Sequence, residues 1–451
     1  MSALSDLPPD QIGPLSRKHN FWTWSAQAEV NPIPVVRAEG VRFWDAKGKG
    51  YLDFNSMMMC SNIGHGNQYV IDAITNQARE LEFAAAAMAT RPRAVLGKML
   101  AEITPPGLDR FLYTLGGAEA TENAIKLARA ATGRHKILAR YRSYHGATYG
   151  AIAATGDPRR WAWEPLVMPG VVHFFDPYRY RSALHRGRPP SDDAEFAQDY
   201  LAQLEETIQL EGPETIAAIL VETVTGTNGV IVPPDGYLQG VRALCDRNGI
   251  LLICDEVMSG FGRTGAWFAV EHWNVVPDLM TMAKGITSAY APLGAVAMTE
   301  KVASTFDHRV YQGGLTFNGH PLSLAAAIAN IEVMRDLGLV ERAGAIGKIL
   351  ARSLAELGES HRSVGDVRSI GLFAAVELVR DRRTREPMAP FNGTSPEMMG
   401  LKKFLLDRGL YVVIHWNTIL IVPPLITTED ELAEGMAILD EGLNLTDRAA
   451  A

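Results

Sequence analysis

The sequence predicts an α/β fold in which a mostly parallel sheet is flanked by helices. The clearest observation is that two apolar segments of strand length, Ile216–Val221 and Ile250–Cys254, lie on either side of a helical pattern that begins near Tyr237. A second observation is that Gly249 ends this helix directly before the next strand. A strand, a helix and a second strand at this spacing form a βαβ unit, whose strands are parallel.

The two ends of the chain have a different pattern, which predicts a second, smaller α+β domain. Long amphipathic helices dominate after about residue 325, and short alternating strands occur near the N-terminus. We therefore expect residues 63–325 to form the large domain, and residues 1–62 and 326–451 to form the small domain together. The strands predicted for the small domain are Val41–Trp44, Tyr51–Phe54, Gly371–Val379, Leu410–Ile414 and Ile419–Val422.

The composition excludes several classes of protein. The 451 residues include 43 Lys and Arg against 51 Asp and Glu, and this net charge of −8 disfavours binding to nucleic acid. Three cysteines are too few for a disulfide framework, and the 11 histidines show no paired metal-ligand spacing, so we expect no metal site. The sequence has neither a basic, apolar leader nor a bilayer-length apolar segment, which predicts a cytoplasmic protein without membrane contact.

Polar residues or glycines follow three of the predicted strands of the large domain. Asp255 follows the second strand of the βαβ unit, Lys284 follows the apolar segment Leu279–Ala283, and Gly117 opens a helical pattern after Arg110–Thr114. Taken singly, each group has an ordinary structural explanation: Asp255 as a helix cap, Lys284 as a surface lysine and Gly117 as part of a common turn. Because ligands of open parallel sheets bind beyond the carboxyl ends of the strands, we expect the three groups to lie close together.

Together these three groups suit pyridoxal phosphate. A helix N-terminus after a glycine pair can bind a phosphate through backbone N–H groups. A carboxylate can keep the pyridine nitrogen protonated, and a lysine amine can form a Schiff base with the aldehyde. The glycine pair matches neither the dinucleotide-binding nor the ATP-binding glycine motif, which argues against those two cofactors.

The segment Asp255-Glu-Val-Met-Ser-Gly-Phe-Gly-Arg-Thr-Gly265, with Lys284 29 residues after Asp255, resembles the signature of the class III pyridoxal-phosphate-dependent aminotransferases of fold type I, which include the ω-transaminases. Further segments occur in the family's order, at 144–146, 230–234, 277–279, 292–294, 316–321 and 423–425. The resemblance extends from about residue 20 to the C-terminus. It implies the fold, a homodimer with active sites at the subunit interface, and transfer of an amino group by a ping-pong mechanism.

The resemblance also implies roles for residues around the cofactor ring. Lys284 would hold the cofactor covalently and move a proton, and Asp255 would pair with the ring nitrogen. Tyr144 would stack on one face of the ring and Val257 would pack against the other. Glu222, at the end of strand Ile216–Val221, would lie beside the cofactor and the substrate.

The phosphate would be bound from two directions. Gly117 and Ala118 would offer backbone N–H groups, and Thr316 would reach the phosphate from the partner subunit. The family usually has serine where this chain has Ala118, so one hydroxyl donor is missing. Met258 likewise stands where many relatives have glutamine.

Five residues are expected at the substrate: Trp22, Met59, Met88, Tyr144 and His415. Trp22 and Trp24 fit a lid over the site, and Met88 belongs to a segment that relatives place in the partner's pocket. Two other polar residues are expected to be structural, His145 through bonds to the backbone and Arg263 as a member of an ion pair.

The expected substrate class rests on an absent arginine. Relatives that accept α-carboxylates often have an arginine at the position of Val413, and this chain has none between Gly409 and Leu425. We therefore expect a primary amine or ω-amino donor, with pyruvate as the favoured keto acid. The alternatives are a taurine or 4-aminobutyrate transaminase that uses 2-oxoglutarate, or an aminomutase, racemase or decarboxylase on the same scaffold. A non-catalytic protein is disfavoured because Lys284 and Asp255 are both present.

Overall fold

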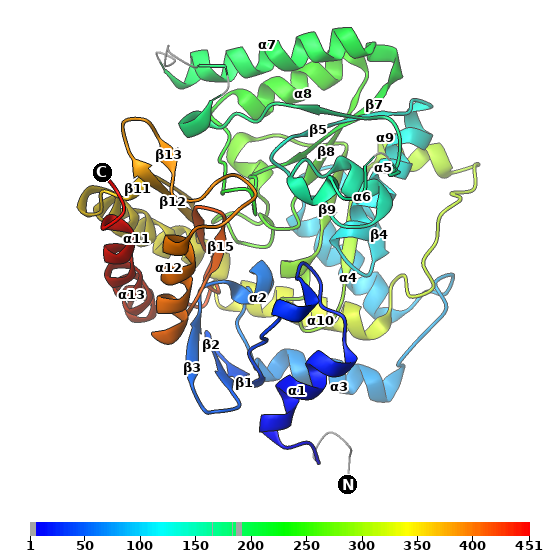
Figure 1. Cartoon of the computed structure of the whole chain (residues 1–451). Coiled ribbons are helices and arrows are strands. Elements are labelled where there is room, and N and C mark those ends of the chain that lie inside the picture. The colour runs from blue at the N-terminus through cyan, green and yellow to red at the C-terminus, as the bar shows by residue number, and fades with distance from the viewer. Residues whose placement is uncertain (1–5, 165, 183, 186–191) are drawn as a thin grey trace.

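The computed structural model of the protein describes residues 6–164, 166–182, 184–185 and 192–451, and Figure 1 shows its arrangement. A seven-stranded sheet forms the centre of the large domain. In spatial order its strands are β4 (Leu108–Thr114), β10 (Gly294–Thr299), β9 (Leu279–Met282), β8 (Leu251–Asp255), β7 (Ile216–Glu222), β5 (Lys136–Arg140) and β6 (Val171–Phe174).

The sheet is mostly parallel, as predicted. Strands β6, β5, β7, β8 and β9 pair in parallel, and only β10 runs antiparallel to its neighbours β9 and β4. The register aligns Glu222 with Asp255 and Asp255 with Thr281, so the carboxyl ends of three strands lie level with one another. Lys284 follows β9 at the same edge.

Helices cover both faces of this sheet because alternate residues of a strand point to opposite sides. Leu251 and Ile253 belong to the core beneath α5, whereas Leu252 and Cys254 belong to the core that includes α7 and α8. Figure 1 shows α7 and α8 together at one side of the sheet. The helices of the large domain are α3 (Gln68–Glu80), α4 (Arg91–Ile103), α5 (Gly117–Thr132), α6 (Tyr149–Ala154), α7 (Asp193–Glu211), α8 (Tyr237–Asn248), α9 (Glu300–Ala303) and α10 (Pro321–Asp336).

The chain ends form two smaller sheets, of which the first contains strands from both ends and the second only strands from the C-terminal part. One contains β1 (Val35–Glu39), β2 (Arg42–Asp45), β3 (Gly50–Asp53) and β14 (Leu410–Tyr411), and the other contains β11 (Val364–Ile370), β12 (Phe373–Asp381), β13 (Glu386–Pro387), β15 (Val413–His415) and β16 (Thr418–Ile421). The helices beside them are α11 (Leu339–Ser360), α12 (Pro396–Asp407) and α13 (Glu429–Asp447). A further helix near the N-terminus is α1 (Ile12–His19), and the segment labelled α2 (Ser56–Met59) is a single left-handed turn.

The predicted fold class is confirmed, whereas the predicted domain limits stay a prediction. Parallel pairing of β14 with β3 joins the two chain ends in one sheet. The strand predicted at Leu410–Ile414 is wrong in one respect, because the chain divides there. Its first two residues pair with β3, and Val413 pairs with Leu420 in the other sheet. None of the helices in the described ranges is both long and apolar enough to cross a membrane.

Candidate active site

A cavity of about 170 Å³ lies at the carboxyl edge of the seven-stranded sheet. It is enclosed by residues that follow strands β4, β5, β7, β8 and β9, which is where a parallel sheet places its ligands. The lining residues are Gly117, Ala118, Tyr144, His145, Gly146, Glu222, Asp255, Val257, Met258, Ala283 and Lys284. Seven of these were predicted from the sequence as site residues, and the structure brings them together.

Asp255 is buried at the end of β8 and is held on both sides of its carboxylate. Its Oδ1 accepts a hydrogen bond of 3.0 Å from the backbone N–H of Val257, and its Oδ2 lies 2.7 Å from Nδ1 of His145. The prediction that His145 bonds to the backbone through its ring is therefore wrong. The chain after β5 brings this ring onto the strand end, so His145 orients the carboxylate instead.

Glu222 is buried at the end of β7, directly beside Asp255. Its two carboxylate oxygens accept hydrogen bonds from the backbone N–H groups of Tyr144 at 2.9 Å and Gly226 at 2.8 Å. Burial raises the pKa of Glu222, with a further increase from the negative charge of Asp255. Glu222 thus fixes the backbone that carries Tyr144.

Lys284 projects into the cavity from the turn after β9. Its backbone has a φ of 47°, which is uncommon for a residue with a side chain and costs conformational energy. Burial lowers the pKa of its ammonium, Arg159 lowers it further, and Cys60, Asp255 and Glu222 oppose the change. A lysine with a lowered pKa is a better nucleophile at neutral pH because more of it is unprotonated.

The N-terminus of α5 lines the cavity close to the residues that follow β8 and β9. Gly117 is the first residue of the helix, so its N–H lacks an acceptor within the helix. A Cβ atom on Gly117 would lie 3.0 Å from Cγ1 of Val257, and one on Gly146 would lie 2.5 Å from the Cβ of Ala118. Glycine at these positions therefore keeps a narrow space open between the helix and the neighbouring loops.

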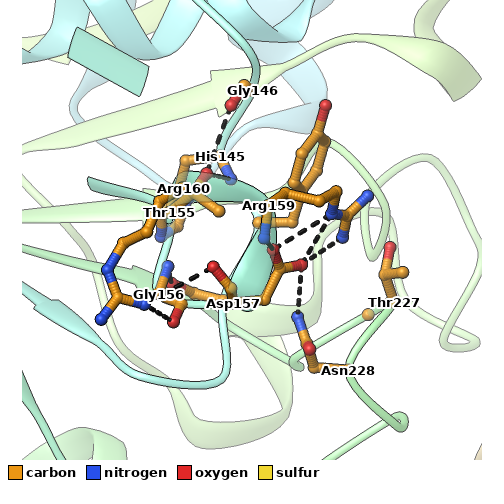
Figure 2. A network of polar contacts seen from close by, with 12 residues as sticks. His145, Gly146, Thr155, Gly156, Asp157, Arg159, Arg160, Thr227 and Asn228 are labelled. Carbon is orange, nitrogen blue, oxygen red and sulfur yellow. Dashed lines mark hydrogen bonds and ion pairs between the residues drawn. The ribbon is translucent and has the colours of Figure 1, made fainter. Parts of the chain in front are cut away.

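The ring of Tyr144, which lines the cavity, contacts an arginine that the sequence analysis did not identify. The guanidinium carbon of Arg159 lies 3.8 Å from the centroid of the Tyr144 ring, and the indole of Trp24 meets the same ring edge-on at 6.5 Å. Figure 2 shows Arg159 paired with Asp157, whose carboxylate also accepts a hydrogen bond of 3.4 Å from Asn228. Trp24, one of the two tryptophans expected in the lid, thus contacts Tyr144, and the role of Trp22 at the substrate stays a prediction.

The remaining predicted substrate residues lie on turns and short strands beyond the cavity lining. Met59 is buried and belongs to a left-handed turn, Ser56–Met59, in which all four residues have positive φ. His415 stacks its ring on Trp416 with 4.0 Å between centroids, and its Nε2 is buried without a partner in the described part of the chain. Burial lowers the pKa of His415 to about 4, and Arg159 adds to this effect.

Thr316 and Met88 lie outside this cavity, on two exposed segments that contact each other. Phe83 and Phe317 meet at 5.8 Å between ring centroids, and Arg93 donates hydrogen bonds both to the carbonyl of Ala86 and to Asn318. Both of the predicted residues are exposed in the single chain, Met88 to 61%. Neither is among the residues that line the cavity of its own chain.

The contacts of Arg263 differ from those predicted. The buried guanidinium donates hydrogen bonds to the carbonyl groups of Leu372 and Pro423 and to Oδ1 of Asn62 at 2.7 Å. Within the described residues no carboxylate pairs with it, so the predicted ion pair is wrong. Burial lowers its pKa to about 9. Arg263 joins the loop after β8 to segments from both chain ends.

The functional candidates that sequence reasoning missed are His145 as a partner of Asp255, and the pair of Asp157 and Arg159. The Tyr144-His145 dipeptide gave a signal for the first, because one ring of the two was expected at the cofactor. Arg159 gave none, since it lies 15 residues after Tyr144 in a short turn without any periodic pattern.

Comparisons with known proteins agree with this geometry. Residues 24–443 match the family described as Aminotransferase class-III. A taurine–pyruvate aminotransferase from Bilophila wadsworthia is 35% identical over 96% of this chain and 97% of its own length. A putrescine–pyruvate aminotransferase from Pseudomonas aeruginosa is 32% identical over 96% of this chain and 95% of its own.

Two solved structures have the same fold over nearly the whole chain. The taurine:2-oxoglutarate aminotransferase of Bifidobacterium kashiwanohense, in complex with PLP and glutamate, superposes with a TM-score of 0.94 at 42% identity and covers 98% of this chain and 99% of its own. An (S)-enantioselective omega-transaminase from Thermomicrobium roseum has a TM-score of 0.89 at 37% identity, with the same coverage. The chain therefore belongs to the class III aminotransferases and is an aminotransferase that depends on pyridoxal phosphate.

Proposed function

We propose that the cavity binds pyridoxal phosphate through the residues predicted from the sequence. The observation that carries the proposal is the convergence of Lys284, Asp255 and the N-terminus of α5 on one cavity. The fit is chemical as well as spatial. Glycines keep the space beside the helix N-terminus narrow, and the buried carboxylate of Asp255 and the side chain of Lys284 line the same cavity.

In this proposal each residue contributes a separate task. Gly117 and Ala118 donate backbone N–H groups to the phosphate, and the helix dipole adds attraction. Asp255, oriented by His145, holds a proton on the ring nitrogen. Tyr144 and Val257 cover the two ring faces.

The bound cofactor would supply an electron sink for the substrate carbon that loses a proton. Lys284 would hold the cofactor covalently and, once displaced by the substrate, carry that proton. Its lowered pKa favours the unprotonated amine, which both tasks require. Glu222 holds Tyr144 in place by accepting a hydrogen bond from its backbone N–H.

We further propose a homodimer in which Thr316 binds the phosphate of the partner's site and Met88 borders its substrate. The support is a surface on which both residues lie together with exposed apolar side chains. Val310 is 74% exposed, Phe317 49% and Phe83 37%. Exposed apolar residues gathered from two segments are typical of a surface that another protein covers. The proposed location is the cytoplasm, which agrees with the three free cysteines.

The proposed reaction is transfer of an amino group from a primary amine or ω-amino donor to a keto acid, with pyruvate favoured. Because residue 413 is a valine, the strand before the Pro-Pro-Leu motif has no arginine that could bind a carboxylate. Two of the similar proteins are named for pyruvate as the acceptor and for taurine or putrescine as the donor.

A second candidate is transfer from taurine or 4-aminobutyrate to 2-oxoglutarate. It is supported by the similarity to the taurine:2-oxoglutarate enzyme of Bifidobacterium kashiwanohense. An aminomutase or racemase on the same scaffold is less favoured, because the named relatives are aminotransferases.

A panel of donors with pyruvate or 2-oxoglutarate as the acceptor tests these proposals. We expect amines and ω-amino acids to react with pyruvate faster than glutamate reacts with either acceptor. If glutamate with 2-oxoglutarate is by far the fastest pair and amines are inert, the proposed substrate class is wrong. Racemisation without any keto acid would instead favour the alternative chemistry.

A further inference from the structure

Arg159 is placed beside the active site by two groups with separate effects on its guanidinium. The ring of Tyr144 lies 3.8 Å beneath the guanidinium carbon, a distance at which a cation is attracted to an aromatic face. Asp157 accepts hydrogen bonds from Nε of Arg159 at 3.1 and 2.8 Å and from Nη2. The guanidinium therefore has a fixed plane and a fixed direction.

The pairing with Asp157 uses only one edge of the guanidinium. A guanidinium has five N–H donors, and the contacts to Asp157 come from the edge formed by Nε and Nη2. In the described part of the chain Nη1 has no hydrogen-bond partner, and 27% of the Arg159 side chain is exposed. The edge formed by Nη1 and the second N–H of Nη2 remains available, and its fork matches the geometry of a carboxylate or sulfonate.

Asp157 is suited to hold the arginine and not to bind a substrate. Its side chain is only 1% exposed, and it also accepts hydrogen bonds from the backbone N–H of Arg159 at 2.9 Å and from Asn228 at 3.4 Å. Figure 2 shows the Arg159 side chain extended from this carboxylate, with Arg160 on the opposite side of the backbone. A buried carboxylate that must be paired keeps Arg159 in one orientation.

The surroundings of Arg159 place its charge within range of the reaction. Tyr144 lines the same cavity as Lys284. The positive charge of Arg159 contributes to the lowered pKa of both Lys284 and His415, so both lie within its electrostatic reach. The neutral ring of His415 has a buried Nε2 without a partner among the described residues, and it offers a second hydrogen-bonding group on this side.

We propose that Arg159 binds the acid group of the substrate, so that the site prefers ω-amino donors with a carboxylate or sulfonate to simple amines. The proposal rests on the proposed aminotransfer and deepens it. Asp157 is the positioning residue that keeps the free edge of the guanidinium toward the substrate. The arginine missing at Val413 is thereby replaced from a different part of the chain.

Equilibrium binding tests the proposal without any turnover. The probes are 3-hydroxypropanoate and 2-hydroxyethanesulfonate, which carry the acid group but no amine, titrated calorimetrically into the holoenzyme. We expect R159A to weaken both by roughly 10- to 100-fold, as for loss of a bidentate bond to an anion. R159K, which keeps the charge and loses the fork, should fall between R159A and the wild type. Unchanged affinity in R159A would overturn the proposal.

Steady-state kinetics with matched donors give the second test. With 3-aminopropanoate and taurine, R159A should raise KM about 10-fold or more, while kcat/KM for propylamine should stay within about 3-fold of the wild type. D157N should raise KM for the acidic donors by a smaller factor, with kcat nearly unchanged. R160A removes a charge one residue away and should leave both classes of donor unaffected.

Different results would contradict the proposed role of Arg159 and the proposed aminotransfer. If R159A slows acidic and neutral donors equally, Arg159 has a structural role and the proposal is wrong. If R160A matches R159A, only the local charge matters and the proposed fork is also wrong. If the wild-type holoenzyme transfers no amino group from any donor, the proposed function fails, and the calorimetric comparison still reports on Arg159.

Discussion

The two sides of the active site are built from different kinds of backbone. On the cofactor side, Glu222, Asp255 and Lys284 stand at or just beyond the ends of three adjacent strands, whose relative positions are set by the hydrogen-bonded register. On the substrate side, Trp24 and Arg159 come from irregular segments and short turns. The sheet thus fixes the positions of the reactive side chains, and the turns determine the shape of the space around them.

Backbone strain occurs on both sides, since Lys284 on the cofactor side also has a positive φ of 47°. On the substrate side, positive φ angles occur at Trp24, at all four residues of Ser56–Met59 and at Trp416, which neighbours His415. Left-handed backbone costs a residue with a side chain about 1–2 kcal/mol, so it persists only where tertiary contacts impose it. Because every donor reacts at the same cofactor, changes on the cofactor side should affect all substrates equally, whereas changes on the substrate side should affect some substrates more than others.

The largest effect is expected from Lys284→Ala. In its proposed role Lys284 attaches the cofactor covalently and carries the substrate proton, so without the amine turnover should fall on the order of 10⁴-fold or more with every donor. The cofactor should also separate from the protein on gel filtration, and its characteristic visible band should change. Retention of that band, or of turnover, would show that another lysine has this role.

Asp255→Asn should have the next largest effect. The substitution removes the negative charge that is proposed to keep the ring nitrogen protonated, and turnover should fall by hundreds-fold, or about 3 kcal/mol or more. Cofactor affinity should fall far less, because the phosphate contacts and Lys284 are intact. His145→Ala, measured in parallel, should give a smaller loss of kcat with all donors. Normal kinetics in the Asp255 variant would contradict its proposed role.

The cofactor side was predictable because buried strands have a recognisable apolar pattern in the sequence. The apolar segment before Asp255 and the one before Lys284 predict buried parallel strands, and parallel strands end at the same edge of a sheet. No tertiary knowledge is needed for that step. The resemblance to the family then assigned roles to residues whose proximity the strand pattern had already indicated.

The substrate side was not predictable from the sequence because its residues share neither a strand nor a helical period. Arg159 reaches Tyr144 only because the chain turns back after α6, and nothing in a local pattern encodes that turn. Trp22 and Trp24 were equivalent in the sequence, and the backbone at Trp24, with a φ of 54°, is what directs its ring at Tyr144. Arg263 was mistaken for an ion-pair former because backbone carbonyls as partners leave no trace in the sequence.

Thr316→Ala tests whether the cofactor side is completed by a second chain. The loss of one hydroxyl bond to the phosphate should weaken cofactor binding by about 10-fold in the assembled protein. Sedimentation at decreasing protein concentration should show cofactor and activity lost together with the dimer. An active monomer, or a monomer that binds the cofactor as tightly as the dimer, would show that the site is complete within one chain.

Trp24→Ala and Trp22→Ala form a matched pair on the substrate side. Trp24 meets Tyr144 edge-on, and such aromatic contacts contribute about 0.5–1.5 kcal/mol, so its removal should raise KM by a factor of about 2 to 10. The size of that factor should vary from donor to donor. Trp22→Ala should change KM less. An equal change with every donor, confined to kcat, would break the distinction between the two sides.

The smallest expected effect connects the two sides through Lys284. Burial lowers the pKa of this amine, and the positive charge of Arg159 lowers it further. Because only the unprotonated amine reacts with the cofactor aldehyde, reconstitution of the apoenzyme should accelerate as pH rises, and should level off at a lower pH than for a free lysine.

Arg159→Ala removes a nearby positive charge, so the pKa of Lys284 should rise and the whole profile should move to higher pH. At pH 7.5, cofactor capture followed by stopped-flow absorbance should slow by about two- to threefold, and added salt should reduce the difference only in part, since the pair is partly buried. Arg160→Ala is the control for a general change in charge. A profile that moves to lower pH in the Arg159 variant would show that the guanidinium acts on Lys284 through structure and not through its charge.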